Sequence, residues 1–426
     1  MKNKLLFVLL LVSPIISIAQ PTGGSGATQN DLQLNTITTA LPFMSITPDS
    51  RAGGMGDAGT ALSPSSTSVY WNTSGISFAK DKSEISLSYT PWLRQLTNDM
   101  HLSYLSGYYK INKTHSVGGS LRFFSLGEIT FTDASGNILR EDKPSEYELT
   151  GAYAFRLAEK LSIGVNGKFA YSNLTGGLTV NGVNTKPGVV GAADLSFTYF
   201  NDDAKVGNIK GIYTFATTIN NIGNKVAYSE LAKRDFIPMN LKIGNSFKAE
   251  FDNYNHVTFS LDLQKLLVPT PPITNANLGY ASLPTGVTIG KSNDVGIISG
   301  MIQSFYDAPG VPIINSNGDY SDNTGQSVKG SRLKEELTEI NIAGGVEWWY
   351  NDVFAIRSGV FYESKNKGNR QFLNLGASLK YNMFAIDFSY LASLSGRQSP
   401  LANTLRFTLR LTLGKSGEAN KTNAGE

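Results

Sequence analysis

Residues that could do chemistry are few in this sequence. The chain has no cysteine, which excludes disulfides, thiolate metal sites and thiol nucleophiles. Its three histidines, His101, His115 and His256, are accompanied neither by a Gly-x-Ser-x-Gly elbow nor by a carboxylate motif that would orient a histidine base. The sequence therefore predicts a protein that is not an enzyme and that uses no cofactor and no metal.

Two short segments resemble ligand-binding motifs. Gly54, Gly56 and Gly59 give the spacing of a dinucleotide loop, but no expected strand precedes them, so we expect them to serve close backbone packing. Residues 315–323 place oxygen-bearing side chains at alternate positions, yet they lack the terminal glutamate of a calcium loop. Asn, Asp, Ser and Gly are the residues that favour turns, so an ordinary polar turn explains this second segment more simply.

Charge and composition narrow the class of protein. The formal net charge is +3, and Lys2 and Lys4 of the first few residues supply two of these charges, so nucleic acid is not an expected partner. Only 17% of residues are charged, against 43 Gly, 22 Phe, 19 Tyr and 4 Trp. A chain that is rich in glycine and aromatic residues and poor in charge favours β-structure.

The first residues predict export. Lys2 and Lys4 precede the apolar run 5–12, and Ser17 and Ala19 stand where a signal peptidase reads small side chains. We expect a cleaved signal peptide at residues 1–19, with a retained helical anchor as the alternative. No later stretch approaches the roughly 18 apolar residues of a membrane helix, so the exported chain is expected to be either soluble or a membrane β-barrel.

Period-two alternation identifies the strands. In the last strand, five apolar residues share one face and two arginines and two threonines share the other, as a wall between lipid and an aqueous lumen requires. The apolar set is Leu405, Phe407, Leu409, Leu411 and Leu413, and the polar set is Arg406, Thr408, Arg410 and Thr412.

The same pattern recurs along the chain, and the connections alternate between tight turns and long loops. Short periplasmic turns and long outer loops produce this alternation in outer-membrane barrels, whereas a soluble sandwich has no reason for it. We therefore predict an all-β, fourteen-stranded antiparallel transmembrane outer-membrane barrel. The predicted strands are 84–91, 100–111, 115–125, 145–157, 161–173, 188–201, 210–220, 238–249, 255–264, 339–351, 353–363, 370–381, 384–391 and 402–413.

The residues ahead of the barrel predict a plug. We divide the chain into a signal peptide (1–19), a flexible leader (20–36), a hatch or plug (37–83), the barrel (84–413) and a tail (414–426). In the hatch, Asp49, Arg51 and Asp57 are expected to pair with charges of the lumen. A detached periplasmic tail is the alternative. The candidate lumen charges are Arg122, Arg357, Asp387 and Arg406.

The loop from Lys265 to Thr338 is longer than a connection needs, which is typical of functional loops. Within it, apolar residues at helical spacing follow Asn293 and Asp294 as a cap and precede Pro309 as a stop, so they predict a short amphipathic helix. Its apolar face is expected to bury against the protein's own rim or against a partner. The apolar residues are Val295, Ile298, Met301, Ile302 and Phe305.

Three segments carry a family resemblance. Residues 39–59, 87–94 and 301–309 resemble the PorV family, the outer-membrane components of Bacteroidota type IX secretion systems. One departure is the turn Trp71-Asn72-Thr73-Ser74-Gly75, where the family more often has Asn-Pro-Ala after Trp. The resemblance implies a FadL-like barrel without enzymatic activity, located in the outer membrane among lipid and lipopolysaccharide.

The resemblance also implies partners. A member of this family would associate with the type IX translocon barrel, bind cargo proteins by their C-terminal secretion signals and carry them to the cell-surface attachment complex. The candidate residues for contact with cargo or translocon lie in the expected outer loops, and they are Trp92, Leu93, Arg94, Met301, Phe305 and Tyr306.

Two other functions remain as alternatives to cargo transport. The protein could be a FadL-like transporter of a hydrophobic small molecule, or it could be a lipid A deacylase.

Overall fold

The computed structural model describes residues 34–415 except 95–96, 98, 133–134, 175, 178, 181–182, 275–287, 314–326 and 395–402. The predicted signal peptide, nearly all of the leader, the calcium-like segment and nearly all of the tail lie outside the described residues. Among the described residues, no helix has the length and the apolar character needed to cross a membrane.

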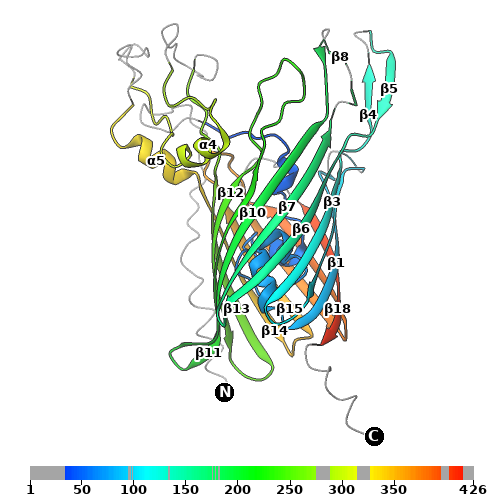
Figure 1. Ribbon diagram of the computed structural model, residues 1–426, viewed down its shortest axis with the longest axis vertical. Helices are drawn as coiled ribbons and strands as arrows, with labels where there is room; N and C mark the ends of the chain where they lie inside the picture. Colours follow the sequence, from blue (N-terminus) through cyan, green and yellow to red (C-terminus); the bar gives the residue numbers. More distant parts are fainter. Residues whose placement is uncertain are drawn as a thin grey trace.

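Fourteen strands of the described chain close into one antiparallel barrel (Figure 1). This confirms the predicted fold class. Neighbouring strands follow the chain order, and β1 closes the wall by pairing with β18. The wall consists of β1 (Asp81–Pro91), β2 (His101–Lys110), β3 (His115–Ser125), β6 (Ser145–Ala158), β7 (Leu161–Asn173), β10 (Gly188–Val206), β11 (Ile209–Gly223), β12 (Asn240–Glu250), β13 (Asn255–Leu266), β14 (Ile340–Tyr350), β15 (Phe354–Tyr362), β16 (Gln371–Tyr381), β17 (Phe384–Ser393) and β18 (Thr404–Lys415).

Each strand has one outward and one inward face. In β18, Leu409 is 46% exposed on the outside, whereas Thr408 and Arg406 are buried inside. Successive side chains of a strand point to opposite faces, so an apolar outer band and a polar lumen require this alternation.

The two ends of the barrel differ. At one end the strands are joined by tight turns such as the one at Asn351 and Asp352, both of which have positive φ. At the other end the long connections carry two small hairpins that the sequence did not predict. These are β4 (Ile129–Thr132) with β5 (Ile138–Asp142), and β8 (Thr179–Val180) with β9 (Val183–Asn184). Figure 1 shows them rising from the rim that we call the outer rim.

Residues 35–80, here called the lumenal segment, lie inside the barrel (Figure 1). The segment forms η1 (Pro42–Ser45), α2 (Ser50–Gly54), α3 (Ser68–Trp71) and η2 (Thr73–Phe78). Helix α2 contacts β15 to β18, and η2 contacts β6, β7 and β10, so the segment bridges opposite parts of the wall. It begins near the outer rim, where the Asn35 N–H donates to the carbonyl of Asn366.

Glycines allow this segment to press against the wall. Gly56 has φ +72°, and a Cβ there would lie 2.5 Å from the backbone nitrogen of Val360. On the wall side, a Cβ at Gly359 would lie 2.1 Å from the carbonyl carbon of Met55. Close backbone approach is therefore the use of the Gly-rich motif, as predicted.

Two helices lie in the connection between β13 and β14, at the outer rim (Figure 1). Helix α4 (Ile297–Gln303) falls within the predicted amphipathic stretch, but it begins after Gly296, without a side-chain cap from Asn293 or Asp294. Helix α5 (Ser331–Thr338) was not predicted.

Candidate functional site

An ion network joins the lumenal segment to the wall. The Arg51 Nη2 donates to Glu347 Oε1 at 2.8 Å, and Arg357 Nη2 lies 3.0 Å from the other oxygen of the same carboxylate. Asp387 then links Arg357, at 3.2 Å, to Arg410, at 2.7 Å. The charges in the network are buried but share hydrogen bonds, which offsets part of their desolvation cost.

The two predicted hatch acids have different partners. Asp49 caps α2 by accepting from the Ala52 N–H at 3.0 Å, and it accepts from Trp71 Nε1 at 2.6 Å, so it serves helix geometry rather than pairing with a lumen cation. Asp57 lies 3.9 Å from Arg406 Nη1, which is a loose ion pair.

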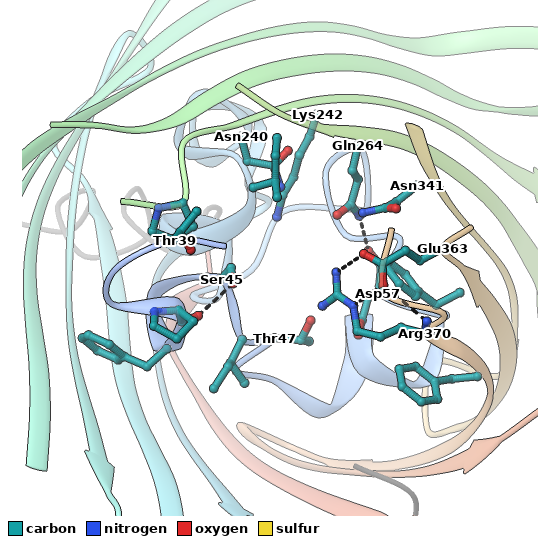
Figure 2. A pocket seen from close by; sticks show the side chains of 18 of the residues that line it. Thr39, Ser45, Thr47, Asp57, Asn240, Lys242, Gln264, Asn341, Glu363 and Arg370 are labelled. Carbon is teal, nitrogen blue, oxygen red and sulfur yellow. Dashed lines mark hydrogen bonds and ion pairs between the residues drawn. The ribbon is translucent and has the colours of Figure 1, made fainter. Parts of the chain in front are cut away.

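A cavity of about 500 Å³ lies between the lumenal segment and the outer ends of the strands. Figure 2 shows Lys242, Asn240 and Gln264 entering it from β12 and β13, with Glu363 and Arg370 on a neighbouring side. Its size is that of a ligand pocket. Several aromatic rings also line it, namely Phe43, Tyr70, Trp71, Trp92, Phe124, Phe361 and Phe372.

Most charges that line the cavity have partners, and one does not. Glu363 binds Arg370 at 2.8 Å, and Glu339 binds Lys367 at 2.9 Å. Lys242 is buried with its Nζ 4.3 Å from the centre of the Trp71 ring, and no hydrogen bond or ion pair joins it to any described residue. The lining thus presents a cation that has no direct ion pair with a described residue and that is stabilised by the faces of Tyr70 and Trp71 and by the negative charge of Asp262.

Helix α5 buries acidic side chains and exposes leucines, which is the reverse of a typical helix on the surface of a soluble protein. Glu335 of the helix and Glu339 at its C-cap are 2% and 5% exposed, while Leu333 and Leu337 are 67% and 59% exposed. The buried acids are satisfied by lysines of the wall and of the β15–β16 connection, since Lys265 lies 2.6 Å from Glu339 and Lys367 lies 2.7 Å from Glu335.

Asp307, which forms no ion pair with a described residue, lies beside this cluster. Burial and the nearby Glu336 and Glu339 together raise the pKa of Asp307 to about 6, while hydrogen bonds from Gln303 and Thr270 oppose the increase. The Thr270 N–H and Gln303 Nε2 donate to the same carboxylate oxygen, at 3.1 and 3.2 Å. This connects the end of α4 to the start of the long loop.

The predicted contact residues after β1 do not form an exposed group. Trp92 is half-buried and packs edge-on against Phe124, with 5.9 Å between ring centres. It lines the cavity, whereas the sequence predicted an exposed side chain. Leu93 is also half-buried and has φ 48°. Arg94 is exposed, and the next two residues lie outside the described part of the chain.

The predicted contact residues around α4 separate into two groups. Met301 packs inward on the apolar cluster of the outer rim. Phe305 and Tyr306 are 51% and 55% exposed. Ile298 and Ile302 are exposed as well, and together with Phe305 they follow the i, i+4, i+7 spacing of one helix face.

Sequence reasoning missed Lys242 and α5. Lys242 occupies an inward position of β12 in the same alternation as Ser246, so its lumenal orientation could have been read from the pattern. The sequence could not show that Lys242 forms no ion pair with a described residue, because pairing depends on which side chains of other strands reach its ammonium group.

Comparisons with known proteins complete the description. The sequence matches the family described as "Type IX secretion system protein PorV" over residues 28–273. No curated protein matches the sequence.

Solved structures of similar shape include the toluene transporter TodX of Pseudomonas putida, with 9% identity, TM-score 0.45 and coverage of 86% of this chain and 98% of that chain. They also include a FadL homologue of Pseudomonas aeruginosa, with 10% identity, TM-score 0.42 and coverage of 89% and 99%. The family match spans more than half of the sequence and agrees with the barrel and with the motifs at residues 39–59 and 87–94. The chain belongs to the PorV family of type IX secretion system proteins.

Proposed function

We propose that this protein is the outer-membrane component that receives type IX cargo at the translocon barrel by the cargo's C-terminal signal domain and carries it to the cell-surface attachment complex. The family match supports a secretion role, and the exposed side chains of the outer rim are the contact surface that we propose. The observation that carries the proposal is the exposed apolar stripe of α4, because a contiguous apolar patch on an outer loop is typical of a partner-binding surface. The stripe consists of Ile298, Ile302 and Phe305, with Tyr306 beside it.

The lumenal segment fits this role as a closure. We propose that residues 37–83 act as a hatch that keeps the barrel sealed while cargo binds outside, and that residues 1–19 are removed on export. The ion network of Arg51 and the close backbone packing at Gly56 support a firmly held closure. The barrel then serves as a membrane anchor for the outer surface rather than as a pore.

The experiment combines a deletion with a point variant. Deleting the gene is expected to leave proteins that bear the C-terminal signal inside the cell or the periplasm. Phe305→Ala, checked for heat-modifiable folding, is expected to weaken co-purification with cargo or translocon about fivefold or more, because truncating a central aromatic anchor costs more than about 1 kcal/mol. Tyr254→Ala is the matched control, since Tyr254 is 58% exposed in a tight turn at the opposite end.

Two results would contradict the proposal in different ways. A folded Phe305→Ala protein that keeps both partners would remove α4 from the contact surface. A deletion strain that secretes cargo normally but no longer takes up a hydrophobic nutrient would favour the transporter alternative.

A further inference from the structure

Helix α5 turns leucines and cations outward together. Leu333 and Leu337 are 67% and 59% exposed on one face, and the acid Glu335 is buried on the opposite one. Because successive residues of a helix are about 100° apart, Arg332 and Lys334 fall on the two flanks of the leucine face. Both are exposed. The outward side of the helix is therefore a narrow apolar face between two cations.

The outward charge of this region is positive because its acids are used inside. Glu335 and Glu336 pair with lysines of the rim, at 2.7 and 3.4 Å. The other charged side chains of residues 329–338 are Lys329, in the turn before the helix, Arg332 and Lys334. All three are exposed, and none forms an ion pair with a described residue. The exposed charges thus have one sign and no acidic partner among the described residues.

The leucine face continues the lipid-facing surface of the wall. Leu337 precedes Ile340, the first residue of β14, by three positions, so their Cα atoms lie at most about 11 Å apart. Ile340 and Ile342 share the outward face of β14, and Ile342 is 43% exposed. In Figure 1, α5 lies at the outer rim, outside the outline of the wall strands. The helix is therefore at the edge of the apolar band rather than over the lumen.

This arrangement fits the surface of a lipid layer. Leucines at the membrane edge can enter the acyl region, while the long cationic side chains beside them extend to the phosphate groups of the lipids. A protein partner would more often meet a surface whose centre is depleted of charge. Helix α4 has that character, since residues 297–303 include no charged side chain. The two helices of the long loop thus present surfaces of different chemistry.

We infer that α5 lies in the headgroup region of the outer leaflet, with its leucines in the acyl layer and its cations bound to lipid phosphates. The ion pairs of the buried acids hold the helix to the rim in this orientation. The inference does not rest on the proposed function, because cargo plays no part in it. The leucines are Leu333 and Leu337, and the cations are Lys329, Arg332 and Lys334.

The test uses the full-length protein, which has no native cysteine, in vesicles of phosphatidylcholine mixed with phosphatidylglycerol. A polarity-sensitive fluorophore is attached at Leu333→Cys, and lipids with a spin label on the acyl chain serve as the quencher. The matched control is Ile138→Cys, since Ile138 is 66% exposed in the β4–β5 hairpin, which rises from the rim in Figure 1. We expect strong quenching at position 333 and little at position 138. Equal quenching at both positions would overturn the inference.

Charge variants test the contact with phosphate. Lys329→Gln combined with Lys334→Gln is expected to lower the ratio of quenched to unquenched label at position 333 about fivefold or more, because cations near an anionic surface are attracted to it. In vesicles of phosphatidylcholine alone, the double variant should have little effect. Lys143→Gln is the control, since Lys143 is exposed but pairs with Glu128 at 3.3 Å. A double variant that leaves quenching unchanged in the mixed vesicles would overturn the inference.

A protein contact would give a different result. If a partner or another segment of the chain covered the leucines, the fluorophore at position 333 would report apolar surroundings but would be protected from the spin-labelled lipids. That result would overturn the inference in favour of a protein interface. Each variant is first checked for heat-modifiable folding, so that loss of the barrel is not mistaken for loss of lipid contact.

Discussion

At the scale of single residues, buried charges fix how the lumenal segment sits. Arg51 gives two bonds to Glu347 and a third, at 3.0 Å, to the carbonyl of Ser63. The segment is therefore tied to β14 and also to itself. The sequence predicted that Arg51 would pair with a lumen carboxylate, but Glu347 was not among the residues it named.

Arg51→Ala is expected to loosen the lumenal segment without unfolding the barrel. Removing one partner of a buried pair typically costs about 3–5 kcal/mol, and the cost here should fall below that range because Arg357 still pairs with Glu347. Limited proteolysis should show faster cleavage within residues 49–59. Lys143→Ala, which breaks the exposed Lys143–Glu128 pair, is the control, and the same digestion pattern in both variants would argue against the tether.

At the scale of elements, each strand separates lipid from a filled lumen. Leu409 of β18 faces outward, whereas Thr408 accepts from the Ser50 N–H of α2 at 3.0 Å. Helix α2 therefore occupies the lumen directly in front of Thr408. The sequence predicted that Thr408→Arg would destabilise the protein only mildly unless the lumen was crowded. The contact between Thr408 and α2 shows that it is crowded there.

Leu409→Arg is expected to cost roughly 2–4 kcal/mol, because a charge near mid-membrane must leave water. Thr408→Arg is expected to leave the wall paired but to displace α2. Heat-modifiable mobility should thus fall mainly for Leu409→Arg, and protease sensitivity of residues 49–59 should rise mainly for Thr408→Arg. If both variants lost folded barrel equally, the assignment of inner and outer faces would be wrong.

At the scale of the whole molecule, the barrel presents two unlike rims. The long connections, with α4, α5 and both small hairpins, gather at one end, and the tight turns gather at the other (Figure 1). In outer-membrane barrels the long loops face outward. We therefore expect the loops at 126–144, 174–187, 221–237 and 265–338 to face the cell exterior and the turns at 112–114, 351–352 and 382–383 to face the periplasm.

Cysteine labelling tests this orientation, since the chain has no cysteine to compete. Leu231→Cys, at a position 80% exposed in an outer connection, is expected to react with a membrane-impermeant reagent on intact cells. Lys113→Cys, exposed in a tight turn, should react only after the outer membrane is opened. The reverse pattern would invert the topology.

Much of the architecture follows from the sequence alone. The ends of the fourteen wall strands agree with the structure to within five residues, because a two-residue period assigns each side chain to a face and each face of the wall has its own solvent. The Gly-rich motif likewise indicated close packing, since glycine is needed where two backbones meet.

The tertiary structure decided which residues meet. Arg51 and Glu347 are 296 positions apart, and only barrel closure and register bring them together. The inverted polarity of α5 could not be predicted either, because an amphipathic pattern gives two faces but not which one is buried. Here ion pairs with Lys265 and Lys367, from distant parts of the chain, offset the desolvation cost of burying the acids. The absence of a direct ion-pair partner for Lys242 among the described residues has the same reason, because the fold decides which side chains surround it.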